Sequence, residues 1–397
     1  MTRTLGYLVP EFPGQTHAFF WRELNAIEDM GVKVQLYSTR KPPDGSCPHG
    51  FADPAIRRTH YLFPPALNVD MIKGAHPRRL ARAFAYLLAL RDISVRERMK
   101  VAALLPSAWS LVSHAKRHKV SHVHIHSCAN AAHLGALAHI LGDLPYSLTL
   151  HGDLPVYGKS HPSKMRQARF VSAVTRPLAQ QIKAISPETQ APVIWMGVDC
   201  TRFAPVHGVR SRNGRFTLTT VARLNHNKGH RFVLRAMAKL RNRGIMLHYR
   251  IAGSGPEESH IKAEIAALDL QDQVTLLGSV AEDGVLNLLQ TTDALALTSI
   301  RQGEAAPVTV MEAMSCGVPV ICSIIGGTTD MISDGDDGFL VEQENVDQIA
   351  DRIERLMNDP EMAERMGQSA RETALRSFDH RKNAEKLVEQ IFQAHLS

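Results

Sequence analysis

The feature that most constrains the fold of this chain is a regular alternation of short apolar runs with helical patterns. The runs are rich in β-branched residues or alternate with polar ones, which is typical of strands. They lie at Thr4 to Val9, Lys33 to Tyr37, His122 to His126, Tyr146 to Leu150, Phe170 to Val174, Val193 to Met196, Thr217 to Val221, His248 to Ile251, Gln273 to Leu276, Ala294 to Leu297 and Pro319 to Cys322. Strand and helix in alternation predict an α/β fold with parallel sheets covered by helices on both faces.

The length of the chain predicts two such sheets. A chain of 397 residues exceeds what one hydrophobic core usually serves, so we expect two Rossmann-like domains. An irregular, proline-containing stretch from Val198 to Gly214 is typical of a linker. Near the end of the chain, the segment Asp379 to His395 carries apolar residues on one helical face, and we expect it to pack across the domain junction.

Composition argues against several classes of protein. The five cysteines are scattered, odd in number and form no C-x-x-C pair, which argues against a disulfide framework or a zinc site and favours a reducing cytoplasm. Two prolines and a glutamate interrupt the segment Met1 to Phe20, where a secretory signal needs an apolar core. The longest stretch without Asp, Glu, Lys or Arg, Val120 to Gly142, contains five histidines and is a poor membrane span.

Positive charge is concentrated in one segment. The formal charge of the chain is +7, but residues 56–120 contain thirteen Lys and Arg against three Asp and Glu and carry +10, which leaves −3 for the rest. Apolar side chains occur there at helical spacing, so the segment is predicted to lie on anionic lipid, each cation contributing about 1 kcal/mol. The alternative is a set of helices that bury one face and solvate the other. No recognisable nucleic-acid-binding module accompanies the charge, so nucleic acid is not an expected partner.

Two carboxylates mark the segment Ser299 to Thr328. Glu304 and Glu312 are eight positions apart. Because the residue before a proline avoids helical dihedrals and proline suits a first helical turn, we expect Glu304 to end a loop and Glu312 to lie inside a helix that begins near Pro307. That helix would present to an anion the unpaired N–H groups of Val308, Thr309 and Val310. A phosphate flanked by carboxylates that accept from hydroxyls suits a nucleotide sugar, whereas the alternative is a loop and a helix with two unrelated acids.

Basic and glycine-rich loops follow two further strands. The strand Thr217 to Val221 leads into a loop with Arg223 and Lys228, at the place where ligands bind in open α/β sheets, and a diphosphate fits between the two cations. The next strand ends in Ala252-Gly253-Ser254-Gly255-Pro256-Glu257, whose glycines would let the backbone approach a flat ring. This segment is not a dinucleotide fingerprint, because no third glycine follows at the required spacing.

Histidines gather in the first half of the chain. His122, His124 and His126 alternate along a strand and share one face, so they could bind a metal or be partly buried strand residues beside a cleft. His151 follows a strand and precedes Gly152, which permits close approach, so we expect a site role. The alternative for His151 is a structural histidine that caps the loop.

The order of these motifs carries more information than any one of them. It runs from an N-terminal Pro/Gly loop through His151-Gly152, R-x4-K-G, G-x-G-P-E and Leu277-Gly278 to E-x7-E, followed by G-V-P-V and Gly326-Gly327. This order resembles glycosyltransferase family 4, the retaining, nucleotide-sugar-dependent enzymes of the GT-B fold, over essentially the whole chain. The resemblance implies two Rossmann-like domains facing across a cleft. Residues 1–200 would form the acceptor domain, 201–377 the donor domain, and 378–397 a crossover helix packing on the N-terminal domain.

The resemblance also implies roles for individual residues. Arg223 and Lys228 match the family's diphosphate-binding pair. Glu312 matches the acid that accepts from the ribose hydroxyls, Glu304 the acid facing the donor sugar, and His151 the histidine near the transferred sugar. The other implied donor-binding residues are Gly14, Gly253, Gly278, Val280, Ala306, Pro307, Val308 and Thr309. Such enzymes generally use protein cations in place of a metal, so no metal and no other cofactor are expected.

Two departures from the family pattern concern the substrates. Many members read E-G-F-G after the first acid, whereas this chain has Glu304-Ala305-Ala306-Pro307, and Pro307 cannot donate a backbone hydrogen bond. The opening Y-L-V-P-E-F-P-G-Q-T-H-A-F-F-W-R-E-L is similar to that of a subgroup of family members associated with exopolysaccharide and glycolipid assembly, with Gln15, Thr16 and His17 in place of the usual S-E-T.

The Gly197-Val198-Asp199 run matches the family's G-[VI]-D before the linker.

These features predict a retaining glycosyltransferase. It would move a hexose or uronic acid from a nucleotide diphosphate sugar to a lipid-linked saccharide or a membrane lipid, in polysaccharide or glycolipid biosynthesis. We expect it in the cytoplasm, peripheral at the inner face of the cell membrane. The base, UDP or GDP, and the acceptor stay open. Two alternatives are a non-catalytic sugar-nucleotide-binding protein and a nucleotide-sugar epimerase on the same scaffold.

Overall fold

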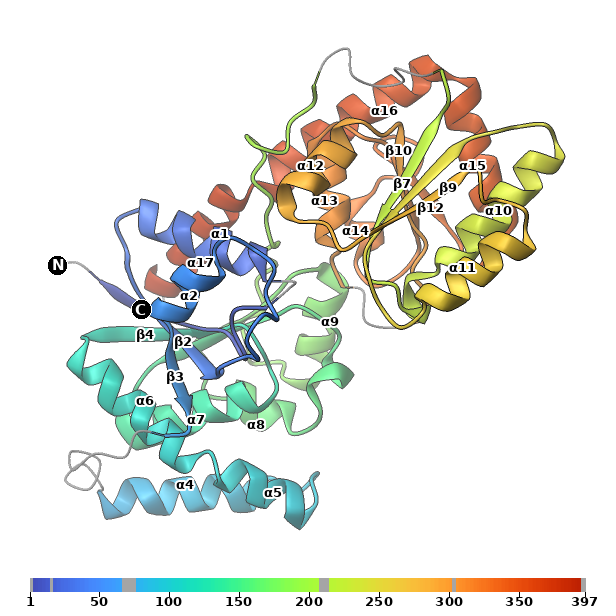
Figure 1. Ribbon diagram of the computed structural model, residues 1–397. Helices are drawn as coiled ribbons and strands as arrows, with labels where there is room; N and C mark the ends of the chain where they lie inside the picture. Colours follow the sequence, from blue (N-terminus) through green and yellow to red (C-terminus); the bar gives the residue numbers. More distant parts are fainter. Residues whose placement is uncertain (1–2, 15–16, 66–75, 207–213, 302–304, 394–397) are drawn as a thin grey trace. The chain divides into compact units, whose positions relative to one another are not determined.

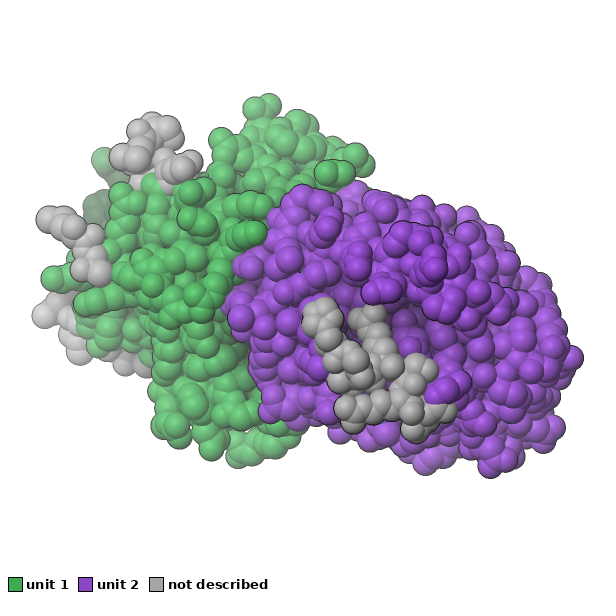
Figure 2. All heavy atoms as spheres, turned by 90° about the horizontal axis from the view of Figure 1, so that it is seen from above, with its two compact units in different colours: residues 1–195, 381–397 green, residues 196–380 purple. Residues whose placement is uncertain are grey.

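Two compact units make up the chain. The computed structural model describes residues 3–14, 17–65, 76–206, 214–301 and 305–393. Unit 1 consists of residues 1–195 and 381–397, and unit 2 of residues 196–380 (Figure 2). Each unit is built on a six-stranded sheet in which all the pairings between neighbouring strands are parallel (Figure 1).

The sheet of unit 1 has the strand order β3-β2-β1-β4-β5-β6. Its strands are β1 (Thr4–Leu8), β2 (Lys33–Arg40), β3 (His60–Phe63), β4 (Val120–Ile125), β5 (Tyr146–Leu150) and β6 (Val171–Ala173). Because β1 pairs with both β2 and β4, the strand order reverses at this point. Open α/β sheets bind ligands in the crevice that such a reversal leaves beyond the carboxyl ends of the strands.

Helices cover both faces of this sheet (Figure 1). They are α1 (Ala18–Asp29), α2 (Ala52–Arg58), α4 (Pro77–Ala89), α5 (Val95–Ala102), α6 (Leu105–Arg117), α7 (Asn130–Gly142), the 3-10 turn η1 (Leu154–Tyr157), α8 (His161–Met165) and α9 (Arg176–Ile185). The helix α7 is buried on nearly all sides, because it contacts β4 and β5 as well as α4 and α6. No helix within the described residues is long and apolar enough to cross a bilayer.

The last helix, α17 (His380–Gln393), packs on the core of unit 1. Its buried side chains Ala384, Leu387, Ile391 and Phe392 join the cluster formed by β1 and α1. Burial of one large apolar side chain contributes about 1.5–3 kcal/mol, so this face is enough to hold the helix. The predicted crossing of the C-terminal helix back to the N-terminal domain is confirmed.

The sheet of unit 2 repeats the topology of unit 1, with the order β12-β11-β10-β7-β8-β9. Its strands are β7 (Thr217–Val221), β8 (His248–Ala252), β9 (Val274–Gly278), β10 (Ala294–Leu297), β11 (Val320–Ser323) and β12 (Phe339–Val341). The first strand, β7, again lies between two neighbours, β8 and β10, so the order reverses there. The two α/β sheets predicted from the sequence are therefore confirmed.

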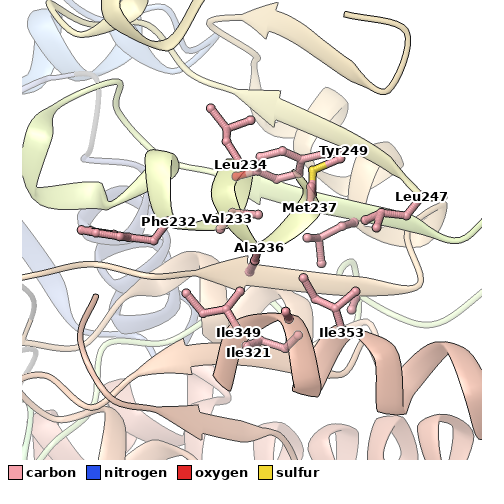
Figure 3. Close-up of a cluster of buried hydrophobic side chains, with 14 of the residues drawn as sticks. Phe232, Val233, Leu234, Ala236, Met237, Leu247, Tyr249, Ile321, Ile349 and Ile353 are labelled. Carbon is pink, nitrogen blue, oxygen red and sulfur yellow. The ribbon is translucent and has the colours of Figure 1, made fainter. Parts of the chain in front are cut away.

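The helices of unit 2 pack on this sheet around one apolar core. They are the 3-10 turn η2 (His226–Lys228), α10 (His230–Asn242), α11 (Glu258–Ala267), α12 (Glu282–Gln290), α13 (Val308–Ser315), α14 (Thr328–Met331), α15 (Val346–Asn358), α16 (Pro360–Thr373) and the π-helical turn η3 (Ala374–Phe378). Figure 3 shows Met237 of α10 and Ile353 of α15 in the same cluster as Tyr249 of β8. Wide apolar faces on both helices produce this packing.

Three strand assignments differ between the sequence and the structure. The apolar runs do not mark β3 and β12, each of which is one of the two outer strands of its sheet. The predicted strand Val193 to Met196 is wrong, because only Val193 forms an isolated bridge, with Ala173. β3 and β12 are only four and three residues long, which leaves little room for the repeated pattern that identifies a strand.

The segment predicted as a linker begins with residues that pack firmly within unit 2. The guanidinium of Arg371, on α16, donates to the carbonyl oxygens of Cys200 and Phe203, both at 2.8 Å, and to that of Ser315 at 2.6 Å. A guanidinium that satisfies several buried carbonyls fixes the backbone that carries them. Residues 207–213 of the predicted linker lie outside the described residues.

The two segments of unit 2 that lead to unit 1 are bonded to each other. Val198 N–H donates to Phe378 O at 2.8 Å, and His380 N–H donates to Val198 O at 3.1 Å, in a parallel bridge between Val198 and Asp379. A Cβ at Gly197 would lie 2.1 Å from His380 Cα, so only glycine fits there. This contact gives a structural reason for the glycine of the G-V-D motif.

We expect the substitution Gly197→Ala to destabilise the protein by about 1–3 kcal/mol, because the added methyl group forces the two backbone segments apart. Thermal and urea unfolding measure the change. Gly50→Ala is the matched control, since a Cβ there meets nothing within 4 Å, and its effect should stay within about 0.5 kcal/mol. Equal stability of the two variants would contradict the packing described for Gly197.

Candidate functional site

The loop after β7, residues 222–229, carries the two predicted cations and is fixed to the end of β10. Thr298 Oγ1 donates to Gly229 O at 3.0 Å, and Ile300 N–H donates to Asn227 O at 2.8 Å. Gly229 has a φ of +68°, and a Cβ on it would lie 2.0 Å from Thr298 O. Glycine is therefore required for the loop to approach β10. These bonds hold Lys228 and its loop at the point where the strand order reverses.

The glycine-rich segment after β8 holds the same loop from its other side. Leu224 N–H donates to Ser254 O at 3.0 Å. A Cβ at Gly253 would lie 1.9 Å from Ala222 O, and one at Gly255 would lie 2.3 Å from Leu224 O. The sequence interpretation assigned these glycines to the approach of a flat ring. The structure shows a different contact for them, the approach of the loop that carries Arg223, whose side chain is exposed.

The end of β9 completes this edge of the sheet. Gly278 O accepts from Gly253 N–H at 2.7 Å, so the loops after β8 and β9 are adjacent. Gly278 is exposed, and Val280, two residues further on, is half-buried. The structure thus places the predicted donor-binding residues Gly253, Gly278 and Val280 at neighbouring carboxyl ends of unit 2 strands.

The helix predicted to begin near Pro307 is α13, whose N-cap residue is Pro307. One detail of the prediction is wrong: the N–H of Val310 donates to Pro307 O at 3.1 Å and is not unpaired. The N–H groups of Val308 and Thr309 belong to the first turn, ahead of the regular helical bonding pattern. The hydroxyl Oγ1 of Thr309 is buried and has no hydrogen-bond partner among the described residues. The N-terminus of α13 therefore has hydrogen-bonding groups that a ligand could use.

Only one of the two predicted acids can be placed. Glu312 lies inside α13 and is 9% exposed, as expected for an acid on a helix that faces the sheet end. Glu304 lies outside the described residues. Of the residues next to it, Ala306 and Pro307 are buried, and Ala305 O accepts from Gly327 N–H at 2.8 Å. That bond brings the Gly326-Gly327 motif to the start of α13.

In unit 1, most of the histidines on β4 are structural. His122 Nε2 lies 2.8 Å from Ser147 Oγ, and His124 contacts Ser147 Oγ at 2.7 Å and Thr149 Oγ1 at 2.8 Å. Burial lowers the pKa of His124 well below its ordinary value, so this ring is neutral. Within the described residues, no group of three or more His, Cys, Asp or Glu side chains could hold a metal ion.

The third histidine, His126, instead contacts His151 beyond the strand ends. His126 Nδ1 lies 3.1 Å from His151 Nε2, and His126 Nε2 lies 3.3 Å from Glu23 Oε1. Tyr7 donates its hydroxyl to the same Glu23 oxygen at 2.8 Å. Gly14, which follows β1, is close to the ring of His17. The sequence reasoning missed Glu23, although it lies in the quoted W-R-E-L run, because nothing in the spacing connects α1 with the end of β4.

Burial controls the charges of this group. It raises the pKa of Glu23 to about 7, against the opposing hydrogen bond from Tyr7. It lowers the pKa of His151 to about 3, with a further lowering from the nearby His17. Burial and the neighbouring His124 and His151 hold the pKa of His126 well below its ordinary value. Near neutral pH the two rings are therefore uncharged, each with one N–H and one lone pair.

The predicted site residues fall in two groups, one in each unit. His151 and Gly14 lie in unit 1, at the carboxyl ends of β5 and β1. The remaining described residues lie in unit 2, beyond β7, β8, β9 and β10. In each unit these residues lie beyond the carboxyl ends of strands, at or near the point where the strand order reverses. Open α/β sheets bind ligands at this place.

Known proteins share this organisation. Residues 17–208 match the family model described as "Glycosyl transferase 4-like domain", and residues 207–373 match that of "Glycosyl transferases group 1". The chain is 27% identical to the putative colanic acid biosynthesis glycosyltransferase WcaL of Salmonella typhimurium, over 94% of this chain and 96% of WcaL. It is 25% identical to the amylovoran biosynthesis glycosyltransferase AmsK of Erwinia amylovora, over 89% of this chain and 90% of AmsK.

A solved structure with the same architecture is that of Anabaena Alr3699/HepE in complex with UDP-glucose. Its TM-score to this chain is 0.73 at 17% sequence identity, and the match covers 98% of this chain and 99% of HepE. The fold is therefore GT-B. The chain belongs to glycosyltransferase family 4 and is of the type that serves polysaccharide biosynthesis.

Proposed function

We propose that this glycosyltransferase takes a hexose or uronic acid from a nucleotide diphosphate sugar and transfers it with retention to a lipid-linked saccharide or a membrane lipid. The observation that carries the proposal is the fixed loop of residues 222–229, which holds Arg223 and Lys228 at the carboxyl ends of β7 and β10. The UDP-glucose bound by HepE, which has the same fold, supports a nucleotide sugar as the donor.

Charge neutralisation is the main task of such a site. As the bond between the sugar and the diphosphate loosens, negative charge builds up on the diphosphate and positive charge on the sugar ring. Two cations on a loop that is bonded to two strands need little reorganisation to stabilise the leaving group. The first turn of α13, with the N–H groups of Val308 and Thr309, adds the positive end of a helix dipole. On this proposal the protein itself supplies the charge, and no metal is required.

The acids are proposed to recognise hydroxyl groups. Glu312 lies one turn into α13 and would accept from the ribose, while Glu304 would accept from the donor sugar. His151 of unit 1 would contact the transferred sugar. The loops after β8 and β9, with Gly253, Gly278 and Val280 at their ends, would hold the base. Ala306 and Pro307 would line the same site beside Glu304.

The acceptor is proposed to be reached at a membrane surface, through α4 and α5. Four apolar side chains of these helices are 61–70% exposed: Phe84, Leu88, Val95 and Met99. Exposed cations lie on the same two helices and on their connection: Arg78, Arg82, Arg91, Arg96 and Lys100. Large exposed apolar side chains among cations are typical of a surface that inserts into the headgroup region of anionic lipid. This arrangement favours a peripheral protein of the inner face of the cell membrane, in the cytoplasm.

A direct test of the proposed reaction uses the purified full chain. It is incubated with a panel of UDP- and GDP-sugars and a total lipid extract, and glycosylated lipid is sought by mass spectrometry. The anomeric configuration of the product, compared with that of the donor by NMR, tests retention. Consumption of a donor without any acceptor would favour the epimerase, and binding without turnover would favour a sugar-nucleotide-binding protein.

We expect Arg223→Ala and Lys228→Ala each to lower the rate of transfer by about 100-fold or more, because loss of one preorganised charge costs about 2.7–4 kcal/mol in the transition state. Steady-state kinetics measure the effect. Lys239→Ala is the matched control, since this cation of α10 pairs with Asp347 at the surface of the same unit. Near-normal turnover of either site variant would refute the assigned role.

We expect Glu312→Gln to act mainly on donor affinity. Charge-assisted hydrogen bonds contribute about 1.5–3 kcal/mol, so calorimetry should show binding of the nucleoside diphosphate weakened by about 10- to 150-fold. A nucleotide that lacks both ribose hydroxyls is the control ligand: the wild-type protein should bind it weakly, and Glu312→Gln should change that affinity little. Equal loss for both ligands would mean that Glu312 acts on the structure and not on the ribose.

We expect the double substitution Leu88→Ser/Met99→Ser to lower binding to vesicles that contain phosphatidylglycerol by more than about tenfold, because each buried apolar side chain contributes about 1.5–3 kcal/mol. Sedimentation with vesicles measures the change. Met246→Ser, in unit 2 and 44% exposed, is the control. Binding of the wild type should also fall at high salt. Binding that is unaffected by the double substitution and by salt would exclude this surface.

A further inference from the structure

Glu23, His126 and His151 form a line of contacts that the proposed chemistry does not yet use. Glu23 lies on α1, His126 directly after β4 and His151 directly after β5, all within unit 1. Glu23 Oε1 lies 3.3 Å from His126 Nε2, an ion-pair distance without hydrogen-bond geometry. His126 Nδ1 and His151 Nε2 are hydrogen-bonded at 3.1 Å. The side chain of His126 is fully buried and that of Glu23 is 15% exposed.

Aromatic rings close off the sides of this line. The ring of Phe20 meets His126 edge-on at 4.9 Å between centroids and His151 at 5.2 Å. The ring of Tyr7 lies 4.4 Å from that of His126. The other titratable groups that act on the three residues are Tyr7, His124 and His17. These rings flank the two imidazoles and limit the other hydrogen-bond partners that they can reach.

The arrangement of protons then follows from counting donors. Two neutral imidazoles that face each other nitrogen to nitrogen need one N–H and one lone pair at their contact. A carboxylate 3.3 Å from His126 Nε2 favours a proton on that nitrogen, because a lone pair there would face a negative oxygen. His126 Nδ1 then carries the lone pair and must accept a hydrogen bond from His151 Nε2–H.

We propose that Glu23 and His126 are positioning residues, which fix His151 as the tautomer protonated on Nε2 with a lone pair on Nδ1. The Nδ1 atom of His151, at the end of the line, is buried and has no hydrogen-bond partner among the described residues. An isolated imidazole can carry its proton on either nitrogen, so the tautomer of His151 must be set by its neighbours. The selecting group is Glu23, which acts on His151 through His126.

The consequence for the reaction rests on the proposed function, in which His151 contacts the transferred sugar. With a lone pair on Nδ1, His151 can accept a hydrogen bond at that nitrogen and cannot donate one there. Loss of Glu23 would allow both tautomers, and a part of the molecules would then present the wrong group. Where a carboxylate orients a metal-ligating histidine, its removal lowers activity by about 10- to 100-fold. We expect a loss of similar size here.

The test is a tautomer measurement on the full chain labelled with 15N-histidine, by long-range 1H–15N correlation at pH 8. This pH lies above the raised pKa of Glu23, about 7, so that the carboxylate is charged. The variants His126→Gln and His151→Gln assign the two signals. In the wild type both rings should carry the proton on Nε2. In Glu23→Leu, a measurable fraction of Nδ1–H should appear at both rings.

Controls separate a local from a general effect. Glu28→Leu removes a carboxylate from the same helix, one that pairs with Arg58 at the surface, and should leave both tautomers unchanged. If Glu23→Leu does not fold, Glu23→Gln keeps the shape, removes the charge and should show the same mixture. A wild-type His151 protonated on Nδ1, or an unchanged spectrum in the Glu23 variant, would overturn the proposal.

Kinetics distinguish this inference from the function on which it rests. Glu23→Leu should lower kcat by about 10-fold or more while the affinity for the nucleotide stays within twofold, because Arg223, Lys228 and Glu312, the side chains proposed to bind the nucleotide, lie in unit 2. If the wild type transfers no sugar but shows the expected tautomers, the proposed function is wrong and the proposed proton arrangement is supported. If the wild type transfers sugar but His151 has the opposite tautomer, the proton arrangement is wrong and the proposed function is supported.

Discussion

Direct contact between backbones at the carboxyl ends of the unit 2 strands is the constraint on which the proposed donor site depends. The loop after β7 can meet β10 and the segment after β8 only because Gly229, Gly253 and Gly255 have no Cβ that would clash with a carbonyl oxygen. Hydrogen bonds then tie the loop down on both sides. Cations on a loop that is held in this way keep their positions when a diphosphate arrives, and this preorganisation is what stabilises a leaving group efficiently.

Unit 1 uses a different device, a buried polar network. Histidine and hydroxyl side chains of β4 and β5 satisfy one another inside the sheet, and burial keeps the rings neutral. At the strand ends the same pattern continues into His126 and His151, where a carboxylate from α1 joins it. A buried network in which protons are shared specifies the role of each nitrogen, which an isolated surface histidine could not do.

Much of the fold followed from local pattern. Buried central strands such as β5, β7 and β10 have apolar, β-branched or alternating runs, and Pro307 marked the start of α13 because proline suits the first turn. The strands β3 and β12 were missed, since four and three residues leave little room for a repeated pattern. Glu23 was missed for another reason: its partner His126 is about a hundred residues away, and no spacing in the chain announces that contact.

The sequence by itself determined the alternating architecture of two parallel sheets, the motif order of a family 4 glycosyltransferase and the cations that follow a strand. These depend on neighbours within a few residues, where periodicity and turn chemistry operate. Only the tertiary structure decided which atoms the glycines admit, that Val310 N–H is already bonded to Pro307, and which carboxylate faces His126. Such contacts join residues far apart in the chain, so they come into being only when the sheets are assembled.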